Sequence, residues 1–289
     1  MKRITLILCL PFIVLLSSLI VSCSNSSQQS EAVTEETVVE EVAEVPYDVN
    51  SPETLLLAVA EACGGMNAIK ALNDVEFEYT YVAPDGKKDV SIERYIFENE
   101  VSWAKYSTHE INVMPGAEGD VVQFYDGNSA AVYLGGEAVT DPEVVGVGQF
   151  LRQANYMWFN MMFKMTDPGI VATYQGQEEV DGQTYDKVHV TYDPEVTGKE
   201  ENDIFVVYIN PDSRMVESFY FSLPAFGVQE PVLHAQLTYE QVNGIYVITH
   251  RVMKGPNPET GEMGLIVDQQ LKNVKFNNGF TADQLSQEM

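Results

Sequence analysis

Hydrophobic and polar residues alternate along most of the chain, and this pattern predicts strands. In the run VEFEYTY, the aromatic residues Phe77, Tyr79 and Tyr81 take alternate positions, while Glu76 and Glu78 lie between them. Alternation with a period of two is typical of a strand that buries one face. We therefore expect the three aromatic side chains on the concave face of a sheet and the two carboxylates in solvent.

Short turn sequences separate the alternating runs. They are Pro84-Asp85-Gly86, Asp126-Gly127-Asn128, Asp181-Gly182, Asn210-Pro211-Asp212 and Asn243-Gly244. Such turns between β-branched and aromatic runs are strong hairpin signals. Strands joined by hairpins are antiparallel, so we expect a single meandering sheet of about ten or eleven strands.

A helix is expected before the first strand. Ser51 can cap it, Pro52 suits its first position, and the following leucines and valine form an apolar stripe. Gly64-Gly65 should end it, and residues 66–72 should form a second short helix.

The segment between residues 140 and 170 contains no hairpin signal. Thr140-Asp141-Pro142-Glu143 predicts a helix start, and the helix should run to about Tyr156. The ten residues from there, YMWFNMMFKM, are too apolar for one face of a helix or strand, so two sides should avoid water. Together with the three strand aromatics, the candidate ligand-cavity residues are Tyr156, Trp158, Phe159, Met162 and Phe163.

The first residues have the pattern of a secretory signal. Lys2 and Arg3 precede an apolar stretch that ends at Ile20-Val21-Ser22-Cys23. The end of this stretch resembles a bacterial lipobox, which implies cleavage after residue 22 and acylation (palmitate among the acyl groups) of Cys23. Acyl chains would then hold the protein on a membrane. An uncleaved membrane-spanning anchor is the alternative.

The chain divides into three expected parts. Residues 1–22 are the signal peptide. Residues 23–50 are acidic and poor in aromatic residues, which predicts a disordered tether behind the acylated cysteine. Residues 51–289 are expected to form one folded domain.

The charge is strongly negative. The full chain has 16 Lys and Arg against 43 Asp and Glu, a net charge of −27, and loss of the two basic residues of the signal peptide makes it −29. A field of this sign repels phosphate backbones, so we expect no nucleic-acid partner.

Candidate catalytic and metal-binding groups are sparse. Cys63 is the one cysteine outside the signal peptide and lipobox, and a buried structural role is expected for it. The four histidines lack ligand spacing, and the sequence has neither a nucleophile elbow nor a phosphate-binding loop. We therefore expect no metal, no cofactor and no enzymatic activity.

Several segments in order resemble the LolA/LolB-like superfamily of envelope lipoprotein carriers, and most closely an uncharacterised LolA-like family of bacterial lipoproteins. They are residues 155–174, residues 178–192, Gly64-Gly65 after the first helix, Tyr125-Asp126-Gly127, and Tyr208-Ile209-Asn210-Pro211-Asp212. The resemblance implies a mainly β (α+β) fold. It is one antiparallel sheet curved into a half-open barrel, with an N-terminal helix and mid-chain helices on its concave face. It also implies an apolar cavity that receives acyl chains.

Three functions are compatible with these features. The first is a monomeric lipoprotein, anchored in the cell envelope at the outer membrane, that binds a lipid or a lipoprotein acyl chain. The second is a scaffolding subunit of an envelope complex, whose barrel is filled by its own side chains. The third is a hydrolase with an unrecognised site. A cavity of about 300 Å³ or more would favour the first function.

Overall fold

The computed structural model describes residues 45–199 and 201–289, which form one compact unit. The predicted signal peptide, the acylation site Cys23 and most of the predicted tether lie outside the described residues. No helix among the residues described here combines the length and the apolar character needed to cross a membrane.

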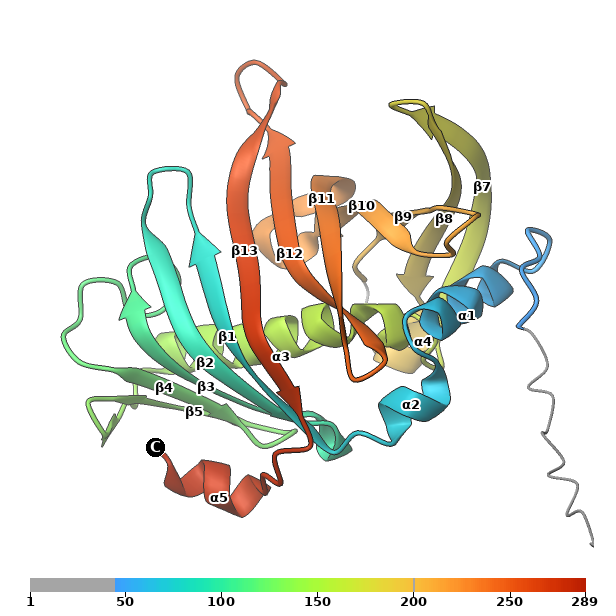
Figure 1. Ribbon diagram of the computed structural model, residues 1–289. Helices are drawn as coiled ribbons and strands as arrows, with labels where there is room; N and C mark the ends of the chain where they lie inside the picture. Colours follow the sequence, from blue (N-terminus) through green and yellow to red (C-terminus); the bar gives the residue numbers. More distant parts are fainter. Residues whose placement is uncertain (1–44, 200) are drawn as a thin grey trace, which may run out of the picture. The chain divides into compact units, whose positions relative to one another are not determined.

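The domain is built on a single antiparallel sheet of thirteen strands, which does not close into a barrel (Figure 1). The predicted fold class is confirmed, with more strands than the turn signals indicated, because short strands such as the two-residue β6 give no alternation. The strands are β1 Asp74–Val82, β2 Lys88–Ile96, β3 Val101–His109, β4 Val121–Tyr125, β5 Ala130–Leu134, β6 Glu137–Ala138, β7 Ile170–Val180, β8 Gln183–Tyr192, β9 Phe205–Ile209, β10 Val216–Leu223, β11 Val228–Val242, β12 Ile245–Pro256 and β13 Met263–Phe276.

The strand order makes the sheet two meanders joined at their centre. The order is β6-β5-β4-β3-β2-β1-β13-β12-β11-β10-β9-β8-β7, so the first strand pairs with the last. The two edge strands, β6 and β7, are consecutive in sequence. The chain between them must therefore travel from one edge of the sheet to the other.

The helices are few and mostly short. They are α1 Pro52–Ala62, α2 Met66–Lys70, α3 Pro142–Lys164, α4 Pro194–Thr197 and α5 Ala282–Gln287, with 3-10 turns η1 Glu98–Glu100 and η2 Pro224–Phe226. Only α3 is long enough to cross the sheet. Its 23 residues span about 35 Å at 1.5 Å per residue.

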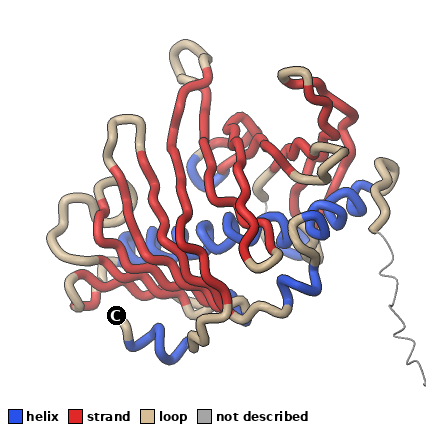
Figure 2. Tube along the Cα trace, viewed as in Figure 1, coloured by secondary structure: helices blue, strands red, loops and turns tan. Residues whose placement is uncertain are grey.

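Helix α3 runs across the sheet and connects its two edges (Figures 1 and 2). The Asp141 side chain caps it by accepting a hydrogen bond from the backbone N–H of Glu143, which confirms the predicted start. The predicted end near Tyr156 is wrong, because the apolar run continues the same helix to Lys164. The sequence contains no proline or glycine between Gly148 and Asp167-Pro168-Gly169, so the backbone has no reason to leave the helix near Tyr156.

The predicted alternation of β1 is confirmed. Phe77 and Tyr79 are buried, Tyr81 is partly buried against the same core, Glu78 is exposed and Glu76 is half-buried in an ion pair with Arg94. Register explains the pattern, since a slip of one residue would bury both carboxylates.

The opposite face of the sheet is also covered near β2, β3 and β4. Leu285 of α5 is fully buried there against Trp103 and Phe124. The Arg94 guanidinium lies 4.8 Å from the Trp103 ring centroid and 4.7 Å from that of Phe280. Helix α5 therefore covers the convex face while α3 covers the concave one.

Two predictions at the start of the domain need correction. The Ser51 side chain makes no capping hydrogen bond; its carbonyl instead accepts one from the Thr54 hydroxyl at 2.7 Å. The domain also begins before the predicted boundary at Ser51, because the Tyr47 hydroxyl donates to Asp186 Oδ2 at 2.8 Å. Asp186 is buried, so residues around Tyr47 pack against the domain instead of belonging to the tether.

Candidate functional site

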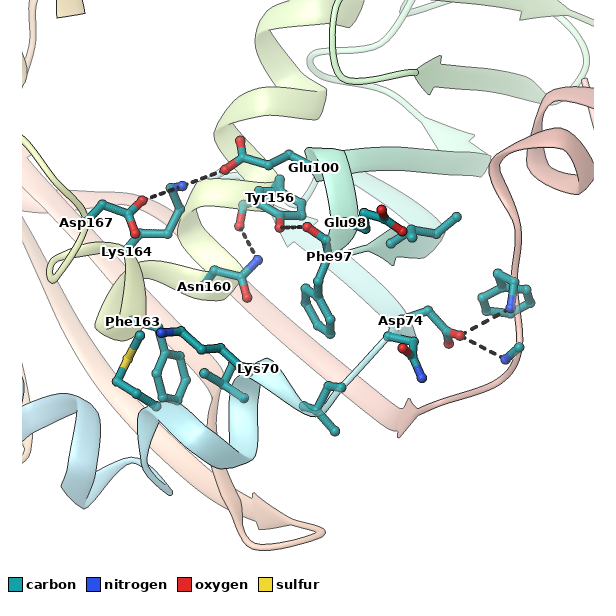
Figure 3. A pocket seen from close by; sticks show the side chains of 17 residues that line it. Lys70, Asp74, Phe97, Glu98, Glu100, Tyr156, Asn160, Phe163, Lys164 and Asp167 are labelled. Carbon is teal, nitrogen blue, oxygen red and sulfur yellow. Dashed lines mark hydrogen bonds and ion pairs between the residues drawn. The ribbon is translucent and has the colours of Figure 1, made fainter. Parts of the chain in front are cut away.

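Two pockets adjoin α3, and both reach its C-terminal half. We call the first the α2 pocket; it has a volume of about 720 Å³ and lies between α2, the end of β2, η1, α3 and the segment before α5 (Figure 3). Its apolar lining consists of Met66, Ile69, Leu72, Ile96, Phe97, Phe163 and Phe280.

We call the second the β10 pocket, with a volume of about 620 Å³. It lies between α3, β9, β10 and η2. Its apolar lining includes Phe150, Met157, Trp158, Phe205, Phe221 and Leu223. Both volumes fall within the range of ordinary ligand sites, about 300–1,000 Å³.

Trp158 forms the aromatic wall of the β10 pocket. Its ring stacks on Phe219 at 5.6 Å between centroids and meets Phe221 edge-on at 5.2 Å. The buried Arg251 donates from Nη1 to the Trp158 carbonyl at 3.0 Å and lies 5.7 Å from the ring centroid. The contacts with Arg251, Phe219 and Phe221 therefore fix the position of Trp158, and its ring forms a rigid wall of the pocket.

Lys164, in the last turn of α3, lines both pockets. Its Nζ lies 2.6 Å from Glu100 Oε1 and 2.7 Å from Asp167 Oδ2. Partial burial works against the charge, but the hydrogen bonds to Asp167 and Glu100 outweigh it and raise the pKa of Lys164 above its ordinary value. Lys164 is thus a cation, and it is neutralised locally by two carboxylates.

Tyr156 is the third side chain common to both pockets, with Lys164 and Glu100. Its hydroxyl points to the backbone carbonyl of Phe97 at 3.5 Å, as Figure 3 shows. The Asn160 amide donates to the Tyr156 carbonyl at 3.1 Å, one helical turn below.

The centre of the concave face is filled. Phe159 stacks on Phe77 with centroids 5.0 Å apart and meets Tyr95 edge-on at 5.7 Å. Met161 and Met162 are buried beside them. At these residues α3 packs directly onto the concave face, and the two pockets described above lie beside this contact.

The eight predicted cavity residues separate into two groups. Tyr156 lines both pockets, Trp158 lines the β10 pocket and Phe163 lines the α2 pocket. The others line neither pocket, because α3 packs directly onto that part of the sheet; they are Phe77, Tyr79, Tyr81, Phe159 and Met162.

Most of the pocket lining was not predicted from the sequence. Phe97 and Glu100 reach the site through η1, where Asn99 and Glu100 have φ angles of 60° and 54°. The sequence Glu98-Asn99-Glu100 between two alternating runs is a turn signal that could have located this wall. The sequence around Phe205 and Phe221 gives no indication that they line a pocket, since each has the pattern of an ordinary strand residue that faces the core.

The nucleophile and base candidates lie apart from each other. Cys63 is fully buried, burial raises its thiol pKa to about 12, and its Sγ lies 3.8 Å from Met215 Sδ. Both His109 ring nitrogens face backbone carbonyls, and His250 Nε2 lies 3.0 Å from Asp268 Oδ2. Within residues 45–199 and 201–289, no group of three or more His, Cys, Asp or Glu is placed to hold a metal ion.

Comparison with known families gives one partial match. Residues 149–230, from within α3 to β11, match a family of unknown function, DUF6503. No curated protein matches the chain.

Among solved structures, this chain is similar to a DUF1329 family protein from Desulfovibrio piger, with 12% identity, 82% of this chain and 96% of the other covered, and a TM-score of 0.48. It is also similar to a LolA superfamily protein from Nitrosomonas europaea, with 12% identity, 81% and 95% covered, and a TM-score of 0.47. A third is a putative outer membrane lipoprotein-sorting protein domain from Vibrio parahaemolyticus, with 8% identity, 83% and 98% covered, and a TM-score of 0.45. The open antiparallel sheet with helices packed on it, which the sequence predicted, is the architecture of this chain.

Proposed function

We propose that this protein is an envelope lipoprotein that binds the apolar chain of a lipid or of an acylated protein beside α3. The observation that carries the proposal is the β10 pocket, which has a volume of about 620 Å³ and an aromatic wall formed by Trp158, Phe205 and Phe221. Phe205 and Phe221 are themselves buried, and the apolar side chains that stay partly exposed in the pocket are Phe150, Met157, Trp158 and Leu223. Partly exposed apolar side chains in a concave site favour an apolar ligand.

The packing of the sheet explains why the ligand would lie beside α3 and not beneath it. The Phe77–Phe159 stack occupies the centre of the face, whereas Met157 and Phe150 point to the side where the free volume is. Truncation of a side chain that lines a pocket should weaken ligand binding more than it lowers the free energy of unfolding. Such a side chain packs against fewer neighbours than a core side chain does, so its loss creates less buried empty space.

Filling the β10 pocket tests this proposal. Ala154 lies on α3 and lines the pocket, so Ala154→Trp should occupy it and weaken binding of a neutral fluorescent naphthylamine probe at least tenfold. Ala68→Trp is the matched control, since Ala68 is exposed on α2 and lines neither pocket. The proposal fails if the wild-type protein shows no saturable probe binding, or if both variants bind as the wild type does.

Anchoring is tested separately. Cys23→Ser should abolish acylation and leave a protein that no longer sediments with membranes, since acyl chains supply the attachment. A Cys23→Ser protein that stays in the membrane fraction after a high-salt wash would contradict lipid anchoring.

The filled centre of the face favours a second candidate, a non-catalytic scaffolding subunit of an envelope complex. In that case the naphthylamine probe should not bind, and the side chains of Phe77 and Phe159 would serve only to stabilise the fold. We propose a binding role over catalysis, because Cys63 is buried beside Met215 without a histidine partner.

A further inference from the structure

The α2 pocket and the β10 pocket meet at three side chains. Glu100, Tyr156 and Lys164 line both pockets, and all other lining residues belong to one pocket alone. The Lys164 side chain extends from α3 to Glu100, as Figure 3 shows. The two pockets are therefore adjoining compartments that share these side chains.

We propose that the Lys164–Glu100 ion pair is a divider that sets the length of apolar chain the site accepts. The inference rests on the proposed function. With the ion pair closed, each compartment takes a short chain by itself. With the ion pair open, the compartments join into one groove that takes a single long chain.

The groove has the right shape for an extended chain. Phe150 lines the β10 pocket and Phe163 lines the α2 pocket, and they are 13 residues apart on α3. At 1.5 Å per residue, the two compartments therefore extend over about 20 Å along the helix. A chain that crosses from one compartment to the other must pass the three shared side chains, of which Lys164 and Glu100 form an ion pair.

The divider is built from parts that can move. The Glu100 side chain is 51% exposed and the Lys164 side chain 25% exposed, so water can solvate both charges when they separate. Asp167 remains as a partner for Lys164 at 2.7 Å, which leaves the ammonium paired after Glu100 swings away. The apolar stem of Lys164 can then lie against the bound chain.

Chain-length preference tests the divider. Binding of a homologous series of neutral alkyl glycosides is measured by displacement of the naphthylamine probe. Lys164→Met keeps the stem without the charge, and Glu100→Gln keeps the shape without the ion pair. Both variants should shift the preferred chain to longer members, with about a tenfold gain in relative affinity for every two further methylenes buried.

Lys187→Met is the matched control, because Lys187 also forms an ion pair with a glutamate, Glu178, its side chain is 23% exposed, and it lines neither pocket. The same charge change there should leave the preferred length unaltered. The divider is overturned if Lys164→Met and Glu100→Gln bind the series with the wild-type length preference, or if Lys187→Met shifts it equally. A wild-type protein that binds no member of the series instead refutes the proposed function.

Discussion

At the scale of single residues, the buried cation Arg152 fixes how α3 sits on the sheet. Its Nη1 pairs with Glu93 Oε2, its Nη2 lies 3.1 Å from Glu93 Oε1 and 2.6 Å from the Tyr106 hydroxyl, and its Nε donates to Gln123 at 3.1 Å. Both members of the ion pair are fully buried. Because four of the five guanidinium N–H groups are hydrogen-bonded to three different strands, the helix has one preferred rotation and register over β2, β3 and β4.

Removing one partner of this pair should be far more costly than removing both. Arg152→Met leaves the Glu93 carboxylate buried without its cation, which should lower the free energy of unfolding by about 3–5 kcal/mol in a urea titration. The double variant Arg152→Met, Glu93→Leu should recover most of that loss, because no charge remains unpaired. Additive losses in the double variant would contradict this account.

Asp203 should make both stability and binding depend on pH. It lines the β10 pocket, and burial raises the pKa of its carboxyl, an effect that nearby Lys199 partly offsets. A raised pKa means that the folded protein holds this proton more tightly than the unfolded chain. Stability from this group therefore falls as the pH rises from the unfolded pKa, about 4, through the raised folded value.

Asp203→Asn should thus stabilise the domain at neutral pH, and the gain should disappear below about pH 4. An apolar ligand that covers Asp203 removes more water from it, so probe binding should strengthen as the pH falls in the wild type and not in the variant. Unfolding curves and probe titrations across this pH range provide the check. A pH profile identical in both proteins would exclude Asp203 from the pocket wall.

At the scale of elements, α3 contains a natural pair of glycines for comparison. A Cβ at Gly146 would have no atom within 4 Å, whereas a Cβ at Gly148 would lie 2.7 Å from Val132 Cγ2 on β5. Gly148 therefore allows the helix to approach the sheet closely, and Gly146 serves no such purpose.

Substitution of the two glycines should give opposite results. Gly146→Ala should raise the free energy of unfolding by up to about 1 kcal/mol, because alanine favours the helix. Gly148→Ala should lower it, since the branched Val132 side chain is buried and has little room to move. Thermal unfolding of both variants is the measurement, and equal shifts would show that α3 does not pack against β5 as described.

The elements that the sequence predicted well depend on short-range chemistry. The β1 alternation and the Asp141 cap follow from residues a few positions apart. The turn at Asp126 does so too, since its carboxylate accepts from the backbone N–H groups of Asn128 and Ser129. The end of α3 was missed because the change in apolar density at Tyr156 resembles a change of element. The backbone itself continues as helix.

The pockets could not be predicted in the same way. The α2 pocket exists because α2, η1 and the segment before Phe280 meet, although they are far apart in the sequence. Phe159 and Trp158 are neighbours in the same apolar run, yet one is packed in the core and the other lines a pocket. The rotation of α3 about its axis decides which of the two side chains faces the core and which faces the pocket. Glu93, which is distant in the sequence, determines this rotation through its ion pair with Arg152.

At the scale of the whole molecule, the pairing of β1 with β13 explains why α3 is needed. That pairing places the first and last strands at the centre and leaves β6 and β7 as open edges. The chain must therefore pass from one edge to the other, and α3 makes that connection while it packs on both halves, with Phe159 on Phe77 of β1 and Trp158 on Phe219 of β10. The ligand compartments thus lie beside the helix that contacts both halves of the sheet.

The net charge of −27 should select the headgroup of the ligand. The α2 pocket adds Glu98, Glu100 and Asp167 around its rim, against Lys164 and Lys70. This negative field repels the headgroup of an anionic amphiphile, whereas it does not repel the headgroup of a neutral amphiphile of equal chain length. Alkyl glycosides should therefore bind more tightly than alkyl sulfates of the same length. The difference should shrink as ionic strength rises, because the Debye length falls from about 30 Å at 0.01 M salt to about 3 Å at 1 M.

Two substitutions separate the local rim from the overall field. Glu98→Gln removes one charge at the α2 pocket, and Glu240→Gln removes one from the exposed part of β11 outside both pockets. If the rim selects the headgroup, only Glu98→Gln should improve binding of the alkyl sulfate at low salt, and Glu240→Gln should behave as the wild type. Equal improvement in both would assign the selection to the charge of the whole domain. If the protein shows no preference for the neutral amphiphile at low salt, the headgroup stays in bulk solvent. Neither the charges at the rim of the α2 pocket nor the charge of the whole domain then acts on it.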